Sequence, residues 1–309
     1  MRKTLCITLL ALVVAACSNS GVSTGSEPHA GPSASFPLIV VASNGPVTIP
    51  KRPARIVSLS STSTEMLFAI GAGSQVVAVD DQSNYPPTAP KTTLSGFEPN
   101  IEAIASYNPD LVVFASDIKQ LGASLEELKI PAVLLAAATT LADTYTQISQ
   151  LGAATGHIRE ARALTARMRR DIRTIVANAP TFSGQLTYYH ELDTTYFTST
   201  SHTFIGTVYA LLHLRNIADP ADKPDNHYPQ LSPEFIIQAN PDVIFLADTG
   251  FAKQTASTVA ARPGWDKIAA VANGNVIGLN DDIASRWGPR IVDYLRSVAD
   301  ALKSVKKAA

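Results

Sequence analysis

Short apolar runs that are rich in Val and Ile recur along the chain, and turn-forming residues separate them. Such runs are typical of buried β-strands. We expect strands over 55–60, 75–79, 111–115 and 132–136 in the first half of the chain, and over 185–190, 243–247 and 275–279 in the second. Helical segments lie between several of these runs. Because strands that alternate with helices favour parallel pairing, the pattern predicts an α/β fold with parallel sheets.

One segment of the chain occurs twice in similar form. IEAIASYNPDLVVFASD at 101–117 aligns with PEFIIQANPDVIFLAD at 233–248, so that Glu102 falls on Glu234 and both copies contain Asn-Pro-Asp. Each copy predicts a short helix that is stopped by Pro and that turns into a buried strand. We therefore expect two similar, Rossmann-like lobes.

A long helix is predicted between the lobes, over 157–179. Apolar side chains recur there every three or four residues, at Ala161, Leu164, Met168, Ile172 and Ile175. At 1.5 Å per residue this helix would be about 33 Å long, which is enough to join two lobes. We assign the chain to an N-terminal lobe, a connecting segment and a C-terminal lobe, over 37–143, 144–180 and 181–309.

Two further helices have clear signals. Near the end of the chain, apolar residues share one helical face, at Ile291, Leu295, Val298 and Leu302. After the first predicted strand, Thr62 and Glu65 have the spacing of a capping box, and Gly71 can end the helix that this box begins.

The first residues have the pattern of a secretory signal peptide, 1–16. Arg2 and Lys3 precede an apolar stretch that is too short to span a bilayer, for which about 20 residues are needed. Val14-Ala15-Ala16-Cys17 resembles the bacterial lipobox, and this resemblance implies cleavage before Cys17 and lipidation of its sulfur. An ordinary secretory cleavage is the alternative. The segment 17–36 is rich in Ser, Gly and Pro, and we interpret it as a flexible tether.

Composition narrows the functional class. The chain is 46% hydrophobic and 17% charged, with a formal net charge of −1. A near-neutral chain without basic blocks argues against nucleic acid as a partner. None of the six histidines forms a pair with the short spacing of a zinc site, so we expect no metal centre and no resident cofactor. The mature chain would retain a single cysteine, and no intrachain disulfide could form.

Several segments resemble the substrate-binding proteins of ABC importers. They are RIVSLSSTSTEMLFAIGAG at 55–73, NYPPTAPK at 84–91, YPQLSPEFI at 228–236 and DDIASRWGPR at 281–290. The resemblance is to the helical-backbone class, which serves vitamin B12, ferric siderophores and haem, and it is strongest to the vitamin B12-binding branch. The resemblance implies a monomeric protein that is exported and anchored to the cell membrane through Cys17. It also implies that the protein captures a small molecule and delivers it to a dimeric permease with its ATPase. It implies a transport function and not an enzyme.

The expected ligand site lies at the carboxyl ends of the strands, in the cleft between the lobes. Loops at such ends offer Tyr85, Phe97 and Trp287 as flat surfaces, and Asp282 and Arg286 as polar anchors. The resemblance implies that the aromatic residues stack on a corrin and that the Asp–Arg pair bonds its amides. At the position of Phe97, the vitamin B12 branch usually has Trp, and at the position of Trp287 it usually has a small residue. The alternative is loop packing for the aromatic residues and a local salt bridge for the pair.

The paired acids Glu102 and Glu234 each fall in the first turn of a predicted helix. A carboxylate there is stabilised by the helix dipole, by about 0.3–1 kcal/mol when it is exposed. The resemblance implies a second role, because the family docks one surface Glu of each lobe onto arginines of the permease.

Other ligands and another class remain open. Haem would need an axial ligand, which Tyr196 or His202 could supply, and basic partners for its propionates. A ferric hydroxamate siderophore is nearly neutral and is the main rival to a corrinoid, while a zinc or manganese receptor is a weaker alternative. As an enzyme, the chain would have to use the cluster HELD at 190–193 for acid–base chemistry. We interpret that cluster as the end of a strand and a turn.

Overall fold

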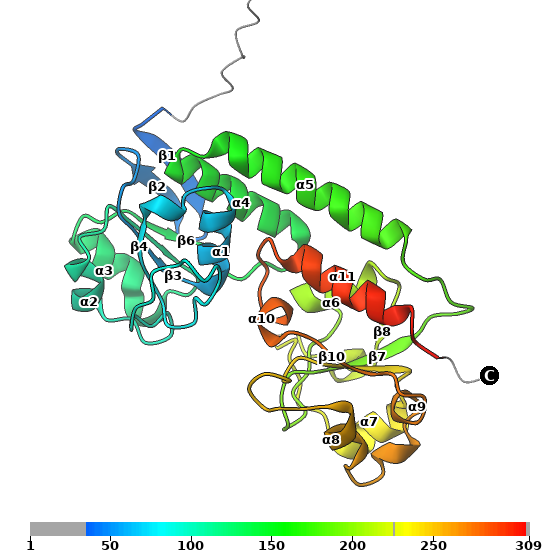
Figure 1. The fold of residues 1–309 in the computed structure, drawn as a ribbon. Helices are drawn as coiled ribbons and strands as arrows, with labels where there is room; N and C mark the ends of the chain where they lie inside the picture. The colour runs from blue at the N-terminus through cyan, green and yellow to red at the C-terminus, as the bar shows by residue number, and fades with distance from the viewer. Residues whose placement is uncertain (1–34, 225, 307–309) are drawn as a thin grey trace, which may run out of the picture. The chain divides into compact units, whose positions relative to one another are not determined.

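Two four-stranded parallel sheets and one antiparallel hairpin form the β-structure of this computed structural model, which describes residues 35–224 and 226–306 (Figure 1). The strands are β1 Leu38–Ala42, β2 Gly45–Ile49, β3 Ile56–Leu59, β4 Val76–Val79, β5 Leu111–Phe114, β6 Ala132–Leu134, β7 Thr187–Glu191, β8 Arg215–Asn216, β9 Val243–Leu246 and β10 Val276–Gly278. The helices are α1 Ser61–Ala69, α2 Ile101–Ser106, α3 Leu121–Glu127, α4 Leu141–Thr155, α5 Ile158–Ala177, α6 Phe204–Ala210, α7 Pro233–Ala239, α8 Ala256–Ala260, α9 Ala269–Ala272, α10 Asp281–Ala284 and α11 Ile291–Leu302.

The two parallel sheets have the same topology. The N-terminal sheet has the order β4-β3-β5-β6 and the C-terminal sheet the order β10-β9-β7-β8. If the four strands of each sheet are numbered 1 to 4 along the chain, the N-terminal sheet has the order 2-1-3-4. The C-terminal sheet has the same order when it is read from β8 to β10. The predicted α/β fold with two similar parallel sheets is therefore confirmed.

The repeated Asn-Pro-Asp segments build the same turn in both sheets. Asn108 and Asn240 adopt the left-handed conformation, with φ of 47° and 46°, which Asn tolerates better than most residues. After each turn, the Asp side chain reaches the neighbouring strand: Asp110 accepts hydrogen bonds from the backbone just before β3, and Asp242 accepts one from the backbone N–H that begins β7. The repeat thus fixes where β5 and β9 start beside their neighbours.

Successive strand residues face opposite sides of each sheet, as the two-residue period of a strand requires. On β5, Leu111 and Val113 belong to one buried cluster, while Val112 and Phe114 belong to another, together with residues of α2 and α3. Both faces of the sheet are covered by helices, which explains why its strands are continuous apolar runs.

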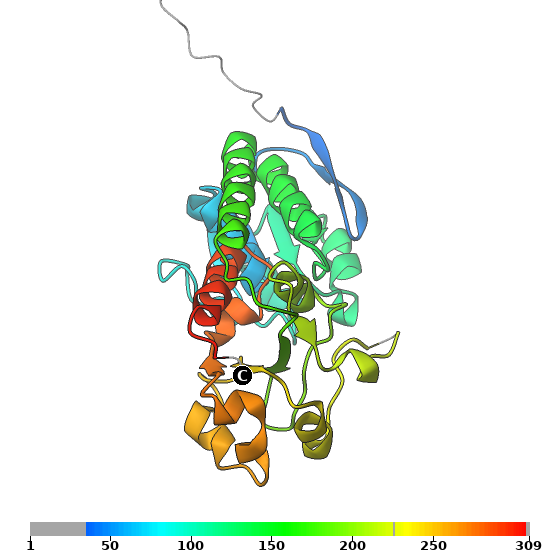
Figure 2. The same cartoon turned by 90° about the vertical axis from the view of Figure 1, so that its right-hand side faces the viewer.

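The predicted long helix is α5, and its apolar face is buried as expected. Ala161, Leu164, Met168 and Ile172 are buried, and Ile175 packs against the same core. Figures 1 and 2 show α4 and α5 side by side, and α5 also contacts α11. The four predicted apolar residues of α11 are buried too. One continuous apolar cluster therefore extends from the N-terminal sheet through these helices to the C-terminal sheet.

Several expectations need correction or remain outside the structure. The N-cap of α1 is Ser60 and not Thr62, and Glu65 is buried instead of capping the helix. The β1–β2 hairpin and β8 were not expected from the sequence. The signal peptide, Cys17 and most of the tether lie outside the described residues, so they stay predictions, as do the lobe boundaries. Among the described residues, no helix is both long and apolar enough to cross a membrane.

Candidate functional site

A cavity of about 800 Å³ lies where the carboxyl ends of both parallel sheets meet. Ser60, Asp80 and Ser116 line it directly after β3, β4 and β5, and Thr249 and Asn280 line it after β9 and β10. The volume falls in the range of small-molecule sites, about 300–1,000 Å³. Its position is that of the ligand crevice in parallel α/β folds.

Phe97 lies in the wall of this cavity, and Gly96 holds it there. A side chain at Gly96 would come within 2.6 Å of the Leu59 carbonyl oxygen at the end of β3, so only glycine lets the loop approach so closely. Ser95 accepts the backbone N–H of Phe97 at 3.2 Å. Phe97 is 70% exposed, which is unusual for a large apolar side chain and leaves its ring free for a ligand.

Phe251 is a second exposed aromatic residue in the cavity, and it was not among the residues predicted from the sequence. It is 67% exposed and comes from the loop after β9. Asp281 fixes this loop, because its carboxylate accepts hydrogen bonds from the Thr249 hydroxyl and from the backbone N–H groups of Gly250 and Phe251. An aromatic residue just beyond a strand's carboxyl end was the signal that could have identified it.

Trp287 also lines the cavity, α4 holds it in place, and its contact with a ligand stays a prediction. Its indole N–H donates to Gln147 Oε1 at 2.9 Å, and its carbonyl oxygen accepts from the Thr144 hydroxyl at 2.9 Å. The half-buried indole is therefore fixed at its polar edge, and the tryptophan links the segment after β10 to α4 of the first half of the chain.

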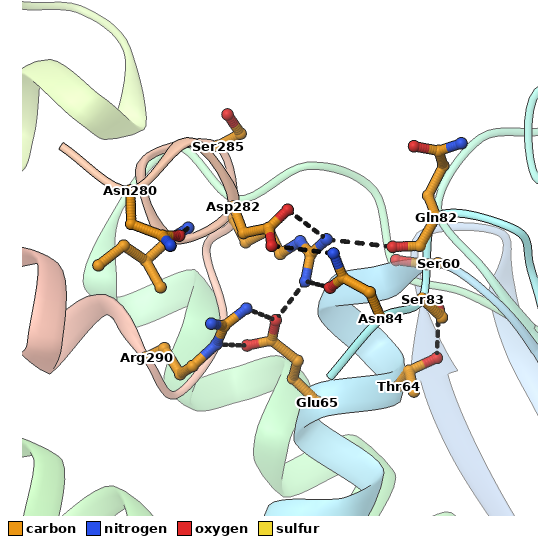
Figure 3. A network of polar contacts seen from close by, with 12 residues as sticks. Ser60, Thr64, Glu65, Gln82, Ser83, Asn84, Asn280, Asp282, Ser285 and Arg290 are labelled. Carbon is orange, nitrogen blue, oxygen red and sulfur yellow. Dashed lines mark hydrogen bonds and ion pairs between the residues drawn. The ribbon is translucent and has the colours of Figure 1, made fainter. Parts of the chain in front are cut away.

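Arg286 lines the cavity but is already heavily hydrogen-bonded. Figure 3 shows the surrounding network and labels its partners Glu65, Gln82, Asn84 and Asp282. Arg286 donates to Glu65 at 2.7 Å, to Asn84 Oδ1 at 2.9 Å, to the Gln82 carbonyl at 3.1 Å and to Asp282 at 3.1 Å. A guanidinium has five N–H donors, so these contacts leave little capacity for a ligand. The predicted Asp282–Arg286 pair exists as a salt bridge within the chain, and its bonding to a ligand stays a prediction.

Glu65 is the centre of this network. Its carboxylate binds Arg286 and also Arg290, whose Nε lies 3.0 Å from Oε2. The side chain of Glu65 is 1% exposed, and those of the two arginines 8% and 18%. Charges buried to this extent persist only when they are paired and hydrogen-bonded. Glu65 thereby attaches the segment after β10 to helix α1.

The charge of the cavity wall is predominantly acidic. Among the described lining residues, Asp80, Asp281 and Asp282 are acids and Arg286 is the cation. Burial raises the pKa of Asp80, although a hydrogen bond from Ser83 opposes this shift. A free cation that could bind an anionic ligand is absent from this set of residues.

Three predicted ligand-binding residues do not line this cavity. Tyr85 lies in a smaller cavity, with the Arg290 guanidinium 4.2 Å from its ring. Tyr196 packs against the buried Trp265, with ring centroids 5.7 Å apart. His202 is exposed and binds Asp222. Their ligand-binding roles stay predictions without support from the cavity geometry.

The two acids that were paired by the repeat occupy equivalent positions. Glu102 is in the first turn of α2, whose N-cap is Asn100, and Glu234 is in the first turn of α7, whose N-cap is Ser232. Both glutamates are exposed, and each helix directly precedes the corresponding strand, β5 or β9.

The first two residues of the HELD cluster are buried, the last two are half-buried, and none of the four lines the cavity. His190 and Glu191 are fully buried, and Glu191 forms a bidentate pair with Arg262, both contacts being 2.6 Å. Burial lowers the pKa of His190 to about 3. Burial, and then the charge of Glu191, raise the pKa of Asp248 to about 7. Because the side chains of His190 and Glu191 are fully buried, they cannot reach a substrate, and we interpret their contacts as structural.

Comparisons with known proteins agree with this geometry. The chain matches the periplasmic binding protein family over residues 56–283. It is 30% identical to the uncharacterized ABC transporter substrate-binding lipoprotein YvrC of Bacillus subtilis, over 95% of this chain and 94% of that protein. It is also 30% identical to a cobalamin-binding protein of Halobacterium salinarum, over 96% of this chain and 83% of that protein.

Solved structures agree as well. The periplasmic vitamin B12 binding protein BtuF of Vibrio cholerae has a TM-score of 0.70 and 26% identity, over 84% of this chain and 100% of that chain. The resemblance seen in the sequence is therefore confirmed. The chain belongs to the periplasmic binding protein family, and it is a substrate-binding protein of the ABC-transporter class and not an enzyme.

Proposed function

We propose that the protein captures cobalamin or a related corrinoid in the cavity and delivers it to the permease of an ABC importer. The observation that carries this proposal is the pair of exposed rings, Phe97 from the N-terminal sheet and Phe251 from the C-terminal sheet, beside Trp287. Flat apolar surfaces of this kind suit a large, flat ligand. The cobalamin-binding relatives support the same ligand.

The charge of the cavity argues against strongly anionic ligands. Haem carries two propionates, and a tri-catecholate siderophore carries a larger negative charge, so both need cationic partners. The lining cation, Arg286, is committed to Glu65 and Asp282, and three acids surround the same space. A ferric hydroxamate is the second candidate, because a chelate without strong negative charge fits this acidic wall.

Thermal melting with cyanocobalamin, ferrioxamine and haemin in parallel tests the proposal. A ligand at 100 times its dissociation constant adds about 2.7 kcal/mol, which raises Tm by about 5–10 °C in a protein of this size. We expect this shift with cyanocobalamin and none with haemin. A shift with ferrioxamine alone would replace the corrinoid by the hydroxamate.

The exposed acids Glu102 and Glu234 are proposed to dock onto the permease. Their equivalent places on α2 and α7 suit a two-fold partner. We expect the double variant Glu102→Ala/Glu234→Ala to bind cyanocobalamin as the wild type does, while uptake into cells is abolished. The double variant Glu126→Ala/Glu127→Ala, which removes two exposed acids of α3, is the matched control and should retain uptake. Loss of binding in the first variant would refute a docking role.

Export and membrane attachment complete the proposal. Cleavage before Cys17 and acylation of that cysteine would hold a monomeric receptor at the outer face of the cell membrane, next to the permease and its ATPase. Mass spectrometry of the exported protein should find a chain that begins at Cys17 and carries acyl groups. An exported chain without acyl groups would show that the protein is not attached to the membrane through a lipid on Cys17.

A further inference from the structure

His202, Asp222 and His227 come together in the C-terminal half of the chain, where His202 lies 20 residues before Asp222 and His227 lies 5 residues after it. The Nδ1 atoms of both imidazoles point at the same carboxylate: His227 Nδ1 lies 2.9 Å from Asp222 Oδ1, and His202 Nδ1 contacts Oδ2. The two ring centroids are 5.4 Å apart. One ligand atom of each residue lies within 4.8 Å of the others.

The chemistry of this group is that of a transition-metal site. Two imidazole nitrogens and one carboxylate oxygen are a donor set that Zn²⁺ accepts, with a fourth position left for water. The carboxylate side chain is 11% exposed, and those of His227 and His202 are 37% and 66% exposed. A cation could therefore enter from the side of the histidines and meet a largely enclosed negative charge.

We propose that His202, Asp222 and His227 bind a divalent transition-metal ion of the Zn²⁺ type, at a site separate from the ligand cavity. None of the three lines that cavity, and the pocket-lining acids belong to other loops. The ion would replace the imidazole protons that now face Asp222, since metal and proton compete for the same nitrogen atoms.

The bound ion would join two loops of the C-terminal part. His202 lies in the loop before α6, while Asp222 and His227 both lie in the connection between β8 and α7. In the structure, the backbone N–H of Thr200 already donates to the His227 carbonyl at 3.0 Å, and that of Ser201 donates to Asp219 at 2.8 Å. The two loops are thus aligned before the ion binds, which lowers the entropy that binding must overcome.

Titration of the untagged, chelator-treated protein with Zn²⁺ tests this proposal. We expect the wild type to bind one equivalent, and His227→Ala and Asp222→Asn each to weaken binding by at least about tenfold. His213→Asn is the matched control: His213 is an exposed histidine of the same part of the chain, and Asn tolerates its positive φ of 58°. This control should bind Zn²⁺ as the wild type does.

Two further readouts distinguish a metal site from a hydrogen-bonded link between loops. Co²⁺ should give visible d–d absorption in the wild type and not in His227→Ala. Zn²⁺ should raise the Tm of the wild type and leave that of Asp222→Asn unchanged, which also reports whether the variant is folded. Absence of Zn²⁺ binding by the wild type, or equal binding by the variants, would overturn the proposal. Neither outcome depends on whether the protein binds a corrinoid.

Discussion

Replacing Glu65 by Gln is expected to lower the free energy of unfolding by about 3–5 kcal/mol, the usual effect of removing one partner from a buried ion pair. The neutral amide would leave Arg286 and Arg290 without their shared carboxylate, and both guanidinium groups lie largely out of water. An Asp282 contact would still neutralise Arg286 in part. Urea unfolding of both proteins measures the difference.

The matched control is Glu102→Gln, which removes an exposed glutamate of α2. The Glu102→Gln variant should lose no more than about 1 kcal/mol of unfolding free energy, because the interaction of an exposed acid with the helix dipole is weak. If Glu65→Gln lowered the free energy of unfolding by as little as Glu102→Gln, the Glu65 network would not be what holds the segment after β10 against α1. The cavity wall formed by Arg286 and Trp287 would then need another explanation for its position.

Asp248→Asn is expected to change how stability depends on pH. The folded-state pKa of Asp248, about 7, lies above the ordinary value of 3.8 because the carboxyl group is buried and faces Glu191. Between these two values the folded state binds more protons than the unfolded state, so the stability contributed by Asp248 is lost as pH rises. The total loss over the whole titration is about 4 kcal/mol, at up to about 1.4 kcal/mol per pH unit.

The titration of His190 changes stability with pH in the opposite direction to that of Asp248 over part of this pH range. The folded-state pKa of His190, about 3, lies below the ordinary value of 6.5, because burial disfavours the charged imidazole. The unfolded state therefore binds more protons between these values, and stability falls as pH decreases through them. In the wild type the two effects offset each other between about pH 4 and pH 6.5.

The difference in stability between Asp248→Asn and the wild type isolates the contribution of Asp248. We expect this difference to shift by about 3–4 kcal/mol in favour of the variant between pH 4 and pH 8, as measured by urea unfolding. Asp266→Asn, at an exposed aspartate, is the control and should show a much smaller shift. A difference that does not change with pH would mean that Asp248 is ionised as easily in the folded protein as in the unfolded chain.

The strands and helices could be predicted from the sequence because the apolar pattern of each element depends only on residues within that element. The apolar runs became β3 to β7, β9 and β10, and the spacing of Ala161, Leu164, Met168 and Ile172 identified the buried face of α5. The Asn-Pro-Asp repeat revealed two sheets of one design, since the same turn must be built twice. The β1–β2 hairpin was missed, although the apolar run Leu38–Ala42 and the following Asn44-Gly45 are a hairpin signal. The two-residue strand β8 was missed because so short a strand carries little pattern.

The candidate site was predicted only in part, because its contacts are long-range. Phe97 and Trp287 were predicted as aromatic residues in loops at strand ends, whereas Phe251 was overlooked although it also follows the end of a predicted strand. Glu65 looked like a helix-capping residue, since nothing near it in the sequence indicates two arginines more than 200 positions away. Tyr85 was placed near the ligand for its ring, whereas in the structure that ring packs under Arg290.

Equilibrium dialysis against cyanocobalamin, with the wild type and the double variant Phe97→Ala/Phe251→Ala, tests whether these two rings bind a flat ligand at the carboxyl ends of both sheets. The rings are exposed, so their removal should leave the fold intact. We predict one binding site in the wild type and at least about 30-fold weaker binding in the variant, as expected for the loss of two aromatic contacts of about 1 kcal/mol or more each. Equal binding by the two proteins, or no binding by the wild type, would mean that the two rings do not form a corrinoid site.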